Sequence, residues 1–201
     1  FTQLMDNTAD VVVTPKSLGD VVSIVTLADT YHTPLIPYGG GTGIMGSITP
    51  TNGGIIVDLR GLNRLIEINA KNMTTTVESG VILEKLNQSL DIENMMIGHE
   101  PWSVPIATIG GAISTNGVGY RASSKGPMGE QVLGLEVVLA SGKVLNTRAI
   151  PKQSIGPNLN YLFIGSEGCF GIITKATLRA QYKPEQQSFC TFNFETFSQG
   201  F

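Results

Sequence analysis

Three glycine-rich segments contain the residues of this chain whose types and spacing could do chemistry. They are residues 37–43, 108–111 and 165–174. Glycine has no Cβ, so each segment can bring backbone N–H groups close to a ligand, and grouped N–H groups bind phosphate and other anionic oxygens. A single loop of this kind says little. Three together predict a large phosphorylated cofactor that is held along its length.

The composition sets limits on the class of protein. The chain has 201 residues, of which 41% are hydrophobic and 14% charged, so we expect a folded core in one domain or two small subdomains. The net charge is −3 and no basic run occurs, which excludes a nucleic-acid-binding surface. No apolar stretch is long enough to span a bilayer. Cys169 and Cys190 are too few for a disulfide scaffold and are expected to be free thiols, with Cys169 as a small buried residue.

A β–α–β unit is predicted to position the first glycine segment. Residues 11–13 form a β-branched run, and a helix is expected to begin after Ser17, with Asp20 as its capping-box partner. A second strand over residues 34–37 leads directly into the glycines. The loop therefore lies at the carboxyl end of a strand, where ligands of open α/β sheets bind.

The remainder of the chain reads mainly as β-hairpins. Apolar spacing predicts a helix over residues 81–90, and alternation predicts a strand over residues 189–194. Further strands are predicted at residues 54–59, 65–69, 74–79, 132–139, 143–147 and 172–182. A β–α–β unit followed by hairpins indicates an α+β fold with two subdomains.

The first loop also matches the G-x-G-x-x-G fingerprint of dinucleotide-binding folds at residues 41–46, with Asp58 at the distance of the ribose-binding acid. That motif requires a helix that begins at the loop. Residues 47–54 contain a proline and two glycines, so no helix fits there, and the Rossmann interpretation is rejected. A phosphate would have to be held by the loop amides and by the hydroxyls of Thr42 or Ser47. The alternative is a glycine-rich turn without a ligand.

Taken in order, the three segments resemble the FAD-binding domain of the vanillyl-alcohol oxidase / p-cresol methylhydroxylase (PCMH-type) superfamily, from about residue 9 to about residue 182. The resemblance implies a PCMH-type domain of two α+β subdomains, residues 1–60 and 61–184, with FAD between them. Such proteins carry a C-terminal cap that binds substrate. Residues 185–201 resemble the start of that cap, so we expect the chain to be part of a longer protein.

The resemblance also implies which residues bind the cofactor. The first loop would hold the pyrophosphate, the middle segment would line the centre of the cofactor and the flavin, and the last segment would form the remaining wall. The implied set is Pro37, Tyr38, Gly39, Gly40, Gly41, Thr42, Gly43, Ser47, Trp102, Ser103, Thr108, Gly110, Gly111, Ser114, Thr115, Asn116, Gly117, Glu167, Gly168, Gly171, Ile172 and Ile173.

Some relatives bind flavin covalently through a histidine in the first loop or a cysteine before the Thr-x-Gly of the middle segment. The matching positions here are Gly41, Ile106 and Ala107, none of which can form such a bond. We therefore expect non-covalent FAD.

Different residues of this chain resemble two different branches of the superfamily. Asn116, Arg121 and residues 132–139 resemble the D-2-hydroxy-acid dehydrogenases (lactate, glycolate), whereas residues 98–101 resemble alkyl-dihydroxyacetonephosphate synthase. The synthase has other residues at the positions of Trp102 and Asn116, so the hydroxy-acid branch is favoured. That branch implies hydride transfer from substrate C2 to flavin N5. A third alternative is an FAD-binding subunit or domain without catalysis of its own.

The catalytic residues are not assigned, because the resemblance places the base and the metal-binding histidines in the cap. His32 and His99 do not form a metal site by spacing, and His99 is expected to be structural. The expected partners are a small-molecule substrate and an electron acceptor, with a homodimer left open and no nucleic acid. The expected location is cytoplasmic, with peripheral membrane attachment left open.

Overall fold

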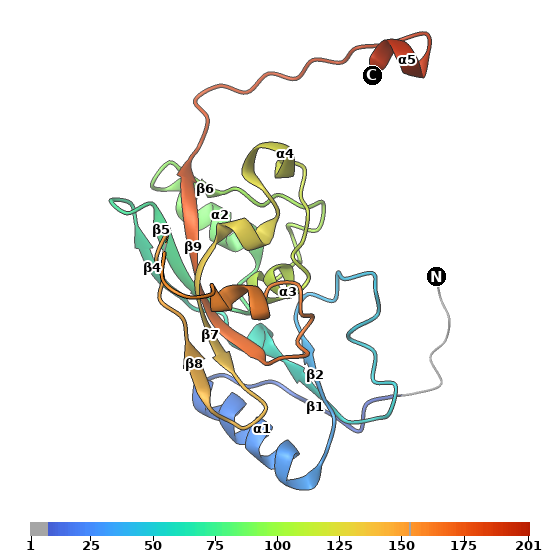
Figure 1. Ribbon diagram of the computed structural model, residues 1–201, viewed down its shortest axis with the longest axis vertical. Helices are drawn as coiled ribbons and strands as arrows, with labels where there is room; N and C mark the ends of the chain where they lie inside the picture. The colour runs from blue at the N-terminus through green and yellow to red at the C-terminus, as the bar shows by residue number, and fades with distance from the viewer. Residues whose placement is uncertain (1–7, 153) are drawn as a thin grey trace.

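A computed structural model describes residues 8–152 and 154–201 and has two β-sheets (Figure 1). The strands are β1 (Val11–Val13), β2 (Leu35–Tyr38), β3 (Ile55–Asp58), β4 (Leu65–Asn69), β5 (Thr74–Glu78), β6 (Met95–Ile97), β7 (Val132–Val138), β8 (Val144–Asn146) and β9 (Ile172–Tyr182). The α-helices are α1 (Leu18–Tyr31), α2 (Leu83–Asp91), α3 (Ile109–Ser114), α4 (Ala122–Lys125) and α5 (Phe197–Gly200), and the 3₁₀ turns are η1 (Leu59–Gly61), η2 (Met128–Gln131) and η3 (Leu159–Leu162). This mixed architecture confirms the predicted α+β class.

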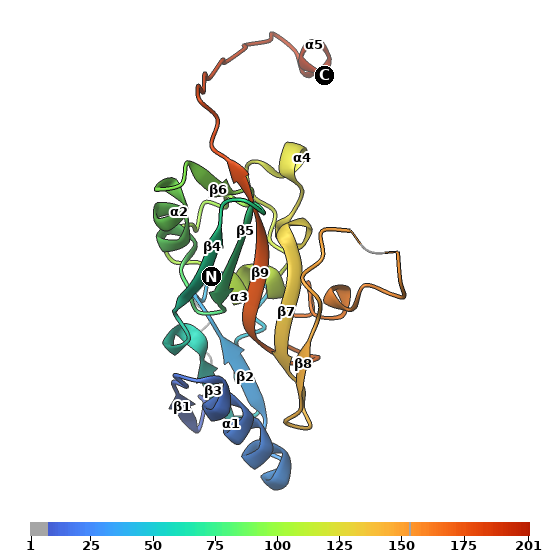
Figure 2. The ribbon, with the colours of Figure 1, turned by 90° about the vertical axis from the view of Figure 1, so that its left-hand side faces the viewer.

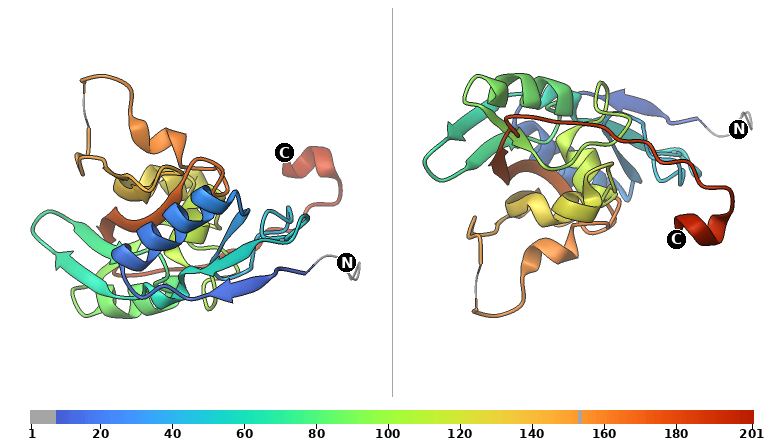
Figure 3. Two further views of the ribbon diagram at one scale, coloured as in Figure 1. Left: turned by 90° about the horizontal axis from the view of Figure 1, so that it is seen from below. Right: turned by 90° about the horizontal axis from the view of Figure 1, so that it is seen from above.

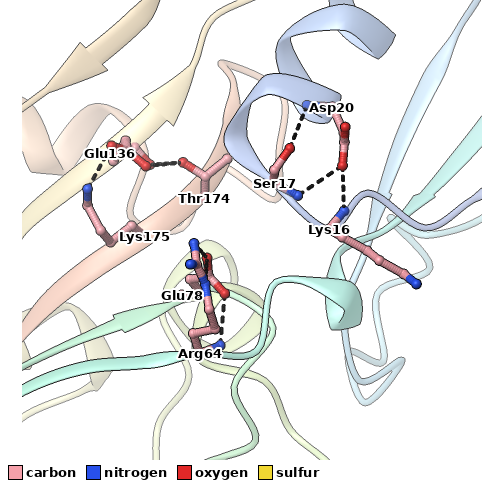
Figure 4. Close-up of polar contacts among 8 residues, drawn as sticks. All are labelled: Lys16, Ser17, Asp20, Arg64, Glu78, Glu136, Thr174 and Lys175. Atoms are coloured by element: carbon pink, nitrogen blue, oxygen red, sulfur yellow. Dashed lines mark hydrogen bonds and ion pairs between the residues drawn. The ribbon is translucent and has the colours of Figure 1, made fainter.

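The smaller sheet is the predicted β–α–β unit with one further strand. Its order is β1-β3-β2, and all three strands are parallel. Helix α1 begins as predicted, because the Ser17 hydroxyl accepts from the Asp20 amide at 3.1 Å and the Asp20 carboxylate accepts from the Ser17 amide at 3.0 Å (Figure 4). This capping box supplies partners for backbone groups that the first helical turn leaves unpaired.

The larger sheet is antiparallel and is built around β9, its longest strand. Its order is β4-β5-β9-β7-β8, and β6 pairs with the far end of β9. The predicted hairpins β4–β5 and β7–β8 are both present. Figure 2 shows the strands of this sheet side by side, with α2 beside them and α1 below.

Helices α2 and α3 cover one face of the larger sheet. Leu83, Leu86 and Leu90 of α2 are almost completely buried and pack in the same core cluster as strands β5, β7 and β9. A second cluster joins the two sheets, because Val21 and Val25 of α1 lie in it with residues of β3, β7 and β9. Seen from below, α1 lies across the ends of the larger sheet (Figure 3). Each fully buried leucine contributes roughly 2 kcal/mol through removal from water.

Two expectations from the sequence are wrong. Residues 189–194 form no strand; they belong to an exposed arm that leaves β9 and extends beyond the sheets (Figure 1). A strand needs a neighbour to pair its backbone groups, and none of the described strands lies beside this arm. Cys169 is exposed rather than buried. It lies in a tight turn whose inner side is taken by Gly168, where an added Cβ would lie 3.0 Å from Pro37 Cγ.

None of the helices in the described parts of the chain is long and apolar enough to cross a membrane.

Candidate functional site

A cavity of about 430 Å³ opens between segments of both sheets and α3. All the residues that the sequence singles out for cofactor binding line it, although they come from three distant parts of the chain. The structure brings together Pro37, Tyr38, Gly39, Gly40, Gly41, Thr42, Gly43, Ser47, Trp102, Ser103, Thr108, Gly110, Gly111, Ser114, Thr115, Asn116, Gly117, Glu167, Gly168, Gly171, Ile172 and Ile173.

The cavity wall contains further residues that the sequence reasoning missed. Most are apolar neighbours of the predicted segments, and adjacency in the chain could have identified them. They are Ile44, Met45, Ile48, Leu59, Ser79, His99, Pro101, Ala112 and Val118. Leu59 and Ser79 are not adjacent to a predicted cofactor-binding segment, so the sequence gives no sign that they line the cavity. Tertiary packing alone brings them there, from the ends of β3 and β5.

The first glycine loop packs so closely that only glycine fits at several positions. A Cβ on Gly40 would collide with the carbonyl oxygen of Ile106, and one on Gly41 would lie 2.5 Å from the Tyr38 hydroxyl oxygen. Gly41 also has a left-handed φ of 67°. Within the described residues, the amides at positions 40–43 donate no hydrogen bond. The loop lines the cavity, and several of its N–H groups are unpaired within the described residues, which is the kind of backbone that binds anions.

The structure supports rejection of the Rossmann interpretation on two grounds. No helix follows the loop before β3. Asp58 is not free to bind a ribose, because Arg60 binds its carboxylate twice, through Nε at 2.9 Å and Nη2 at 2.6 Å. The Arg60 guanidinium holds the pKa of Asp58 below its usual range, chiefly through these side-chain hydrogen bonds.

Helix α3, which the sequence reasoning missed, places the middle glycine segment against the cavity. The Thr108 hydroxyl caps the helix by accepting from the Gly111 amide at 3.3 Å. Gly110 packs so tightly on β5 that an added Cβ would lie 2.7 Å from Ser79 Cβ. The two glycines are poor helix formers, so packing rather than propensity determines this helix.

The turns at residues 114–117 and 165–168 are bonded to each other. The Gly165 amide donates to the Ile113 carbonyl at 3.1 Å, and the Glu167 amide donates to the Ser114 carbonyl at 2.9 Å. Asn116 and Glu167 both have left-handed φ values, 47° and 51°, which side-chain-bearing residues rarely adopt. The Asn116 carboxamide oxygen accepts from the Gly129 amide at 2.9 Å, which helps to hold this conformation.

The cavity carries little formal charge. None of the described lining residues is a lysine or an arginine, and Glu167 is the acidic one among them. Arg121 does not line the cavity but forms an ion pair with Glu100 beside it. Burial lowers the pKa of His99 to about 4, so its imidazole is neutral near pH 7.

FAD fits the residues that are present. The unpaired loop amides suit its pyrophosphate, and the apolar part of the wall suits its rings. Two buried polar atoms of the wall, Ser79 Oγ and His99 Nδ1, have no hydrogen-bond partner among the described residues. A polar ligand could supply partners for such atoms, since buried polar groups are normally hydrogen-bonded. The other histidine, His32, is the exposed C-cap of α1, as its predicted position at the end of the helix requires.

Comparison with known proteins agrees with this site. The family model described as "FAD binding domain" matches residues 9–148. The glycolate oxidase subunit GlcD of Bacillus subtilis is 36% identical over 177 residues, covering 88% of this chain and 38% of that protein. The probable mitochondrial D-lactate dehydrogenase of Danio rerio is 38% identical over 189 residues, covering 91% of this chain and 38% of the relative.

Ether-lipid enzymes are similar as well. The alkyldihydroxyacetonephosphate synthase of Caenorhabditis elegans is 30% identical over 195 residues, covering 95% of this chain and 33% of that enzyme. A solved structure of an alkyldihydroxyacetonephosphate synthase superposes with a TM-score of 0.78 at 30% identity, over 87% of this chain and 34% of that one. The chain thus spans between a third and two fifths of the length of these relatives.

Proposed function

Because the chain belongs to the family of FAD-binding domains of the PCMH type, we propose that it is the flavin domain of an oxidoreductase that oxidises a D-2-hydroxy acid of the lactate or glycolate type. FAD, held in the cavity without a covalent bond, supplies a two-electron acceptor. The observation that carries the proposal is the wall itself: three glycine-rich segments line one cavity. Similarity to the dehydrogenases and to the oxidase subunit supports the substrate class.

The residues of this chain act by binding and orienting. The unpaired amides of the first loop stabilise the phosphates without a full positive charge, and the turns around Asn116 and Glu167 fix the opposite wall. His99 stays neutral, so it can donate or accept one hydrogen bond inside the wall without adding charge. In the described part of the chain, the titratable residues that line the cavity are Tyr38, His99 and Glu167.

The proton of the substrate hydroxyl needs a base with a suitable pKa. His99 is a poor candidate, because burial disfavours its protonated form. We propose that the base and the groups that bind the substrate carboxylate belong to the part of a longer protein that corresponds to the remainder of the relatives.

A second candidate is ether-lipid synthesis, as in the alkyldihydroxyacetonephosphate synthases. Two features favour it: the likeness to the solved synthase structure, and the position of His99 and Pro101 in the cavity wall, since residues 98–101 resemble that enzyme. Trp102 and Asn116 depart from its pattern, and both also line the cavity.

Anaerobic reduction of the bound flavin discriminates between these functions. The full-length protein, purified with FAD, is mixed with D-lactate, glycolate or D-2-hydroxyglutarate, and absorbance near the flavin maximum is followed, with L-lactate as the control. Bleaching by a D-acid supports the first function. Absence of bleaching together with turnover of acyl-dihydroxyacetone phosphate and a fatty alcohol identifies the second. Bound FAD without either activity indicates a flavin-binding subunit.

The non-covalent attachment has its own test. Acid precipitation should leave the FAD in the supernatant, because Gly41, Ile106 and Ala107 offer no atom for a flavin bond. Flavin fluorescence that stays with the precipitated protein would contradict this expectation.

A further inference from the structure

Tyr38, Asp58 and Arg60 contact one another beside the first glycine loop, and the proposed function assigns no role to this contact. Strands β2 and β3 pair in parallel with Tyr38 opposite Asp58, the last residue of each strand. Arg60 follows in η1 and binds the Asp58 carboxylate at two points, 2.9 Å and 2.6 Å. This geometry places the Arg60 guanidinium over the Tyr38 ring, with its central carbon 5.3 Å from the ring centroid.

The fork between Arg60 and Asp58 is more rigid than an ordinary surface ion pair. Asp58 is buried, and it also accepts from the Arg60 amide at 3.1 Å, so both its oxygens have partners. The Arg60 side chain is half exposed, but two parallel hydrogen bonds fix the plane of its guanidinium. A fixed guanidinium over an aromatic face restrains the ring through cation–π attraction.

Tyr38 connects this fork to the cavity. It lines the cavity wall, whereas neither Asp58 nor Arg60 does. Its hydroxyl oxygen would lie 2.5 Å from a Cβ on Gly41, so the phenol fills the side of the loop where Gly41 has its left-handed φ. That hydroxyl has no hydrogen-bond partner in the described residues. A phenolic O–H beside unpaired loop amides is well suited to donate to a phosphate oxygen.

We propose that Arg60 is a positioning residue that acts through Tyr38, fixing the phenol so that its hydroxyl donates a hydrogen bond to a pyrophosphate oxygen of FAD at the first glycine loop. The inference rests on the proposed FAD site. It assigns Asp58, the residue that imitates a ribose-binding acid in the sequence, to orienting Arg60. Arg60 itself touches no bound cofactor.

The chain provides a matched control. Arg64 also pairs with a buried carboxylate: its Nε at 3.0 Å and its Nη2 at 2.7 Å both donate to Oε1 of Glu78, and its amide donates to Oε2 at 2.8 Å (Figure 4). Among the described residues, Arg64 stacks on no aromatic ring that lines the cavity, and it is not a lining residue. Arg60→Met and Arg64→Met therefore each remove an ion pair to a buried carboxylate, but only the first removes support for Tyr38.

The test measures the Kd of FAD by flavin fluorescence for the purified protein, and the melting temperature of each apoprotein. Tyr38→Phe should raise the Kd about tenfold, because a hydrogen bond to a charged group is lost. Arg60→Met should raise it about three- to tenfold, whereas Arg64→Met should change it less than about twofold. The two arginine variants should lower the apoprotein melting temperature by similar amounts.

A double-mutant cycle separates positioning from general stability. If Arg60 acts through the Tyr38 hydroxyl, Arg60→Met should have almost no further effect on the Kd in the Tyr38→Phe background. Additive effects, or equal changes for Arg60→Met and Arg64→Met, would overturn the inference while leaving FAD binding intact. A wild-type protein that binds no FAD would refute the cofactor site and the inference with it.

Discussion

The neutral, buried imidazole of His99 makes the stability of this protein fall in mildly acidic solution. His99 is 1% exposed, and burial lowers its pKa to about 4 from an ordinary value of about 6.5. Below pH 6.5 the unfolded chain takes up a proton at this residue that the folded chain cannot accept until pH 4. The contribution is therefore fully present above pH 6.5, is lost as the pH falls towards 4, and changes no further below that.

The size of the effect follows from the two pKa values. At pH 5 the unfolded imidazole is almost fully protonated and the folded one almost fully neutral, so folding loses about 2 kcal/mol relative to pH 7. The complete loss, reached below pH 4, is about 3 kcal/mol. Replacement by glutamine keeps a polar side chain but removes the titration, so His99→Gln should lack this part of the pH dependence.

Urea denaturation of the apoprotein at pH 7 and pH 5 measures the effect without interference from cofactor release. Carboxylates titrate equally in wild type and His99→Gln. The free energy of unfolding falls between pH 7 and pH 5 in both proteins, and the difference between these two decreases isolates the contribution of the imidazole. His32→Gln, at the exposed cap of α1, is the matched control. With only two histidines in the chain, NMR can also follow each imidazole directly. Equal falls for wild type and His99→Gln, or an ordinary titration of His99, would refute the argument from burial.

Three further outcomes are expected. Gly41→Val should lower the free energy of unfolding by about 2 kcal/mol, because a β-branched residue is forced into the left-handed region. The same substitution should weaken FAD binding at least about tenfold. Full retention of FAD after purification would contradict the role of the loop. Lys175→Met removes the 2.7 Å ion pair of the buried Glu136 and should lower the free energy of unfolding, measured by urea denaturation, by about 1–2 kcal/mol. This loss is smaller than that for a fully buried ion pair, because the lysine is partly exposed. Ser17→Ala should cost about 1 kcal/mol through loss of the helix cap, whereas Ser23→Ala within the same helix should cost nothing measurable by thermal melting.

The elements that could be predicted are those with a strong local signal. The capping box at Ser17 and the leucine spacing of α2 are local patterns, and both helices are present. Strand β9 matches its predicted bounds, because eleven residues rich in β-branched side chains leave little alternative. The α2 helix begins at Leu83, two residues later than the predicted start at residue 81.

The elements that escaped prediction depend on distant partners. Helix α3 contains two adjacent glycines and is stabilised by a distant contact, because Gly110 packs on Ser79 at the end of β5. Strand β6 has three residues and is defined by its pairing with the end of β9. Residues 189–194 show the opposite case: they alternate like a strand, but none of the strands in residues 8–152 and 154–201 lies beside them. The predicted subdomain boundary near residue 60 stays a prediction.

The three glycine-rich segments could be read directly from the amino-acid sequence as the lining of the cavity, and their order indicated an FAD-binding domain. This was possible because the glycine requirement is local: a left-handed φ or a close approach excludes other side chains at that position. The charges and hydrogen-bond partners of the site, in contrast, depend on the folded arrangement. It buried His99 with no partner for Nδ1 among the residues that the structure describes, and it paired Asp58 with Arg60 rather than leaving it for a ligand. Burial and pairing depend on which surfaces meet in the fold, and no local pattern encodes that.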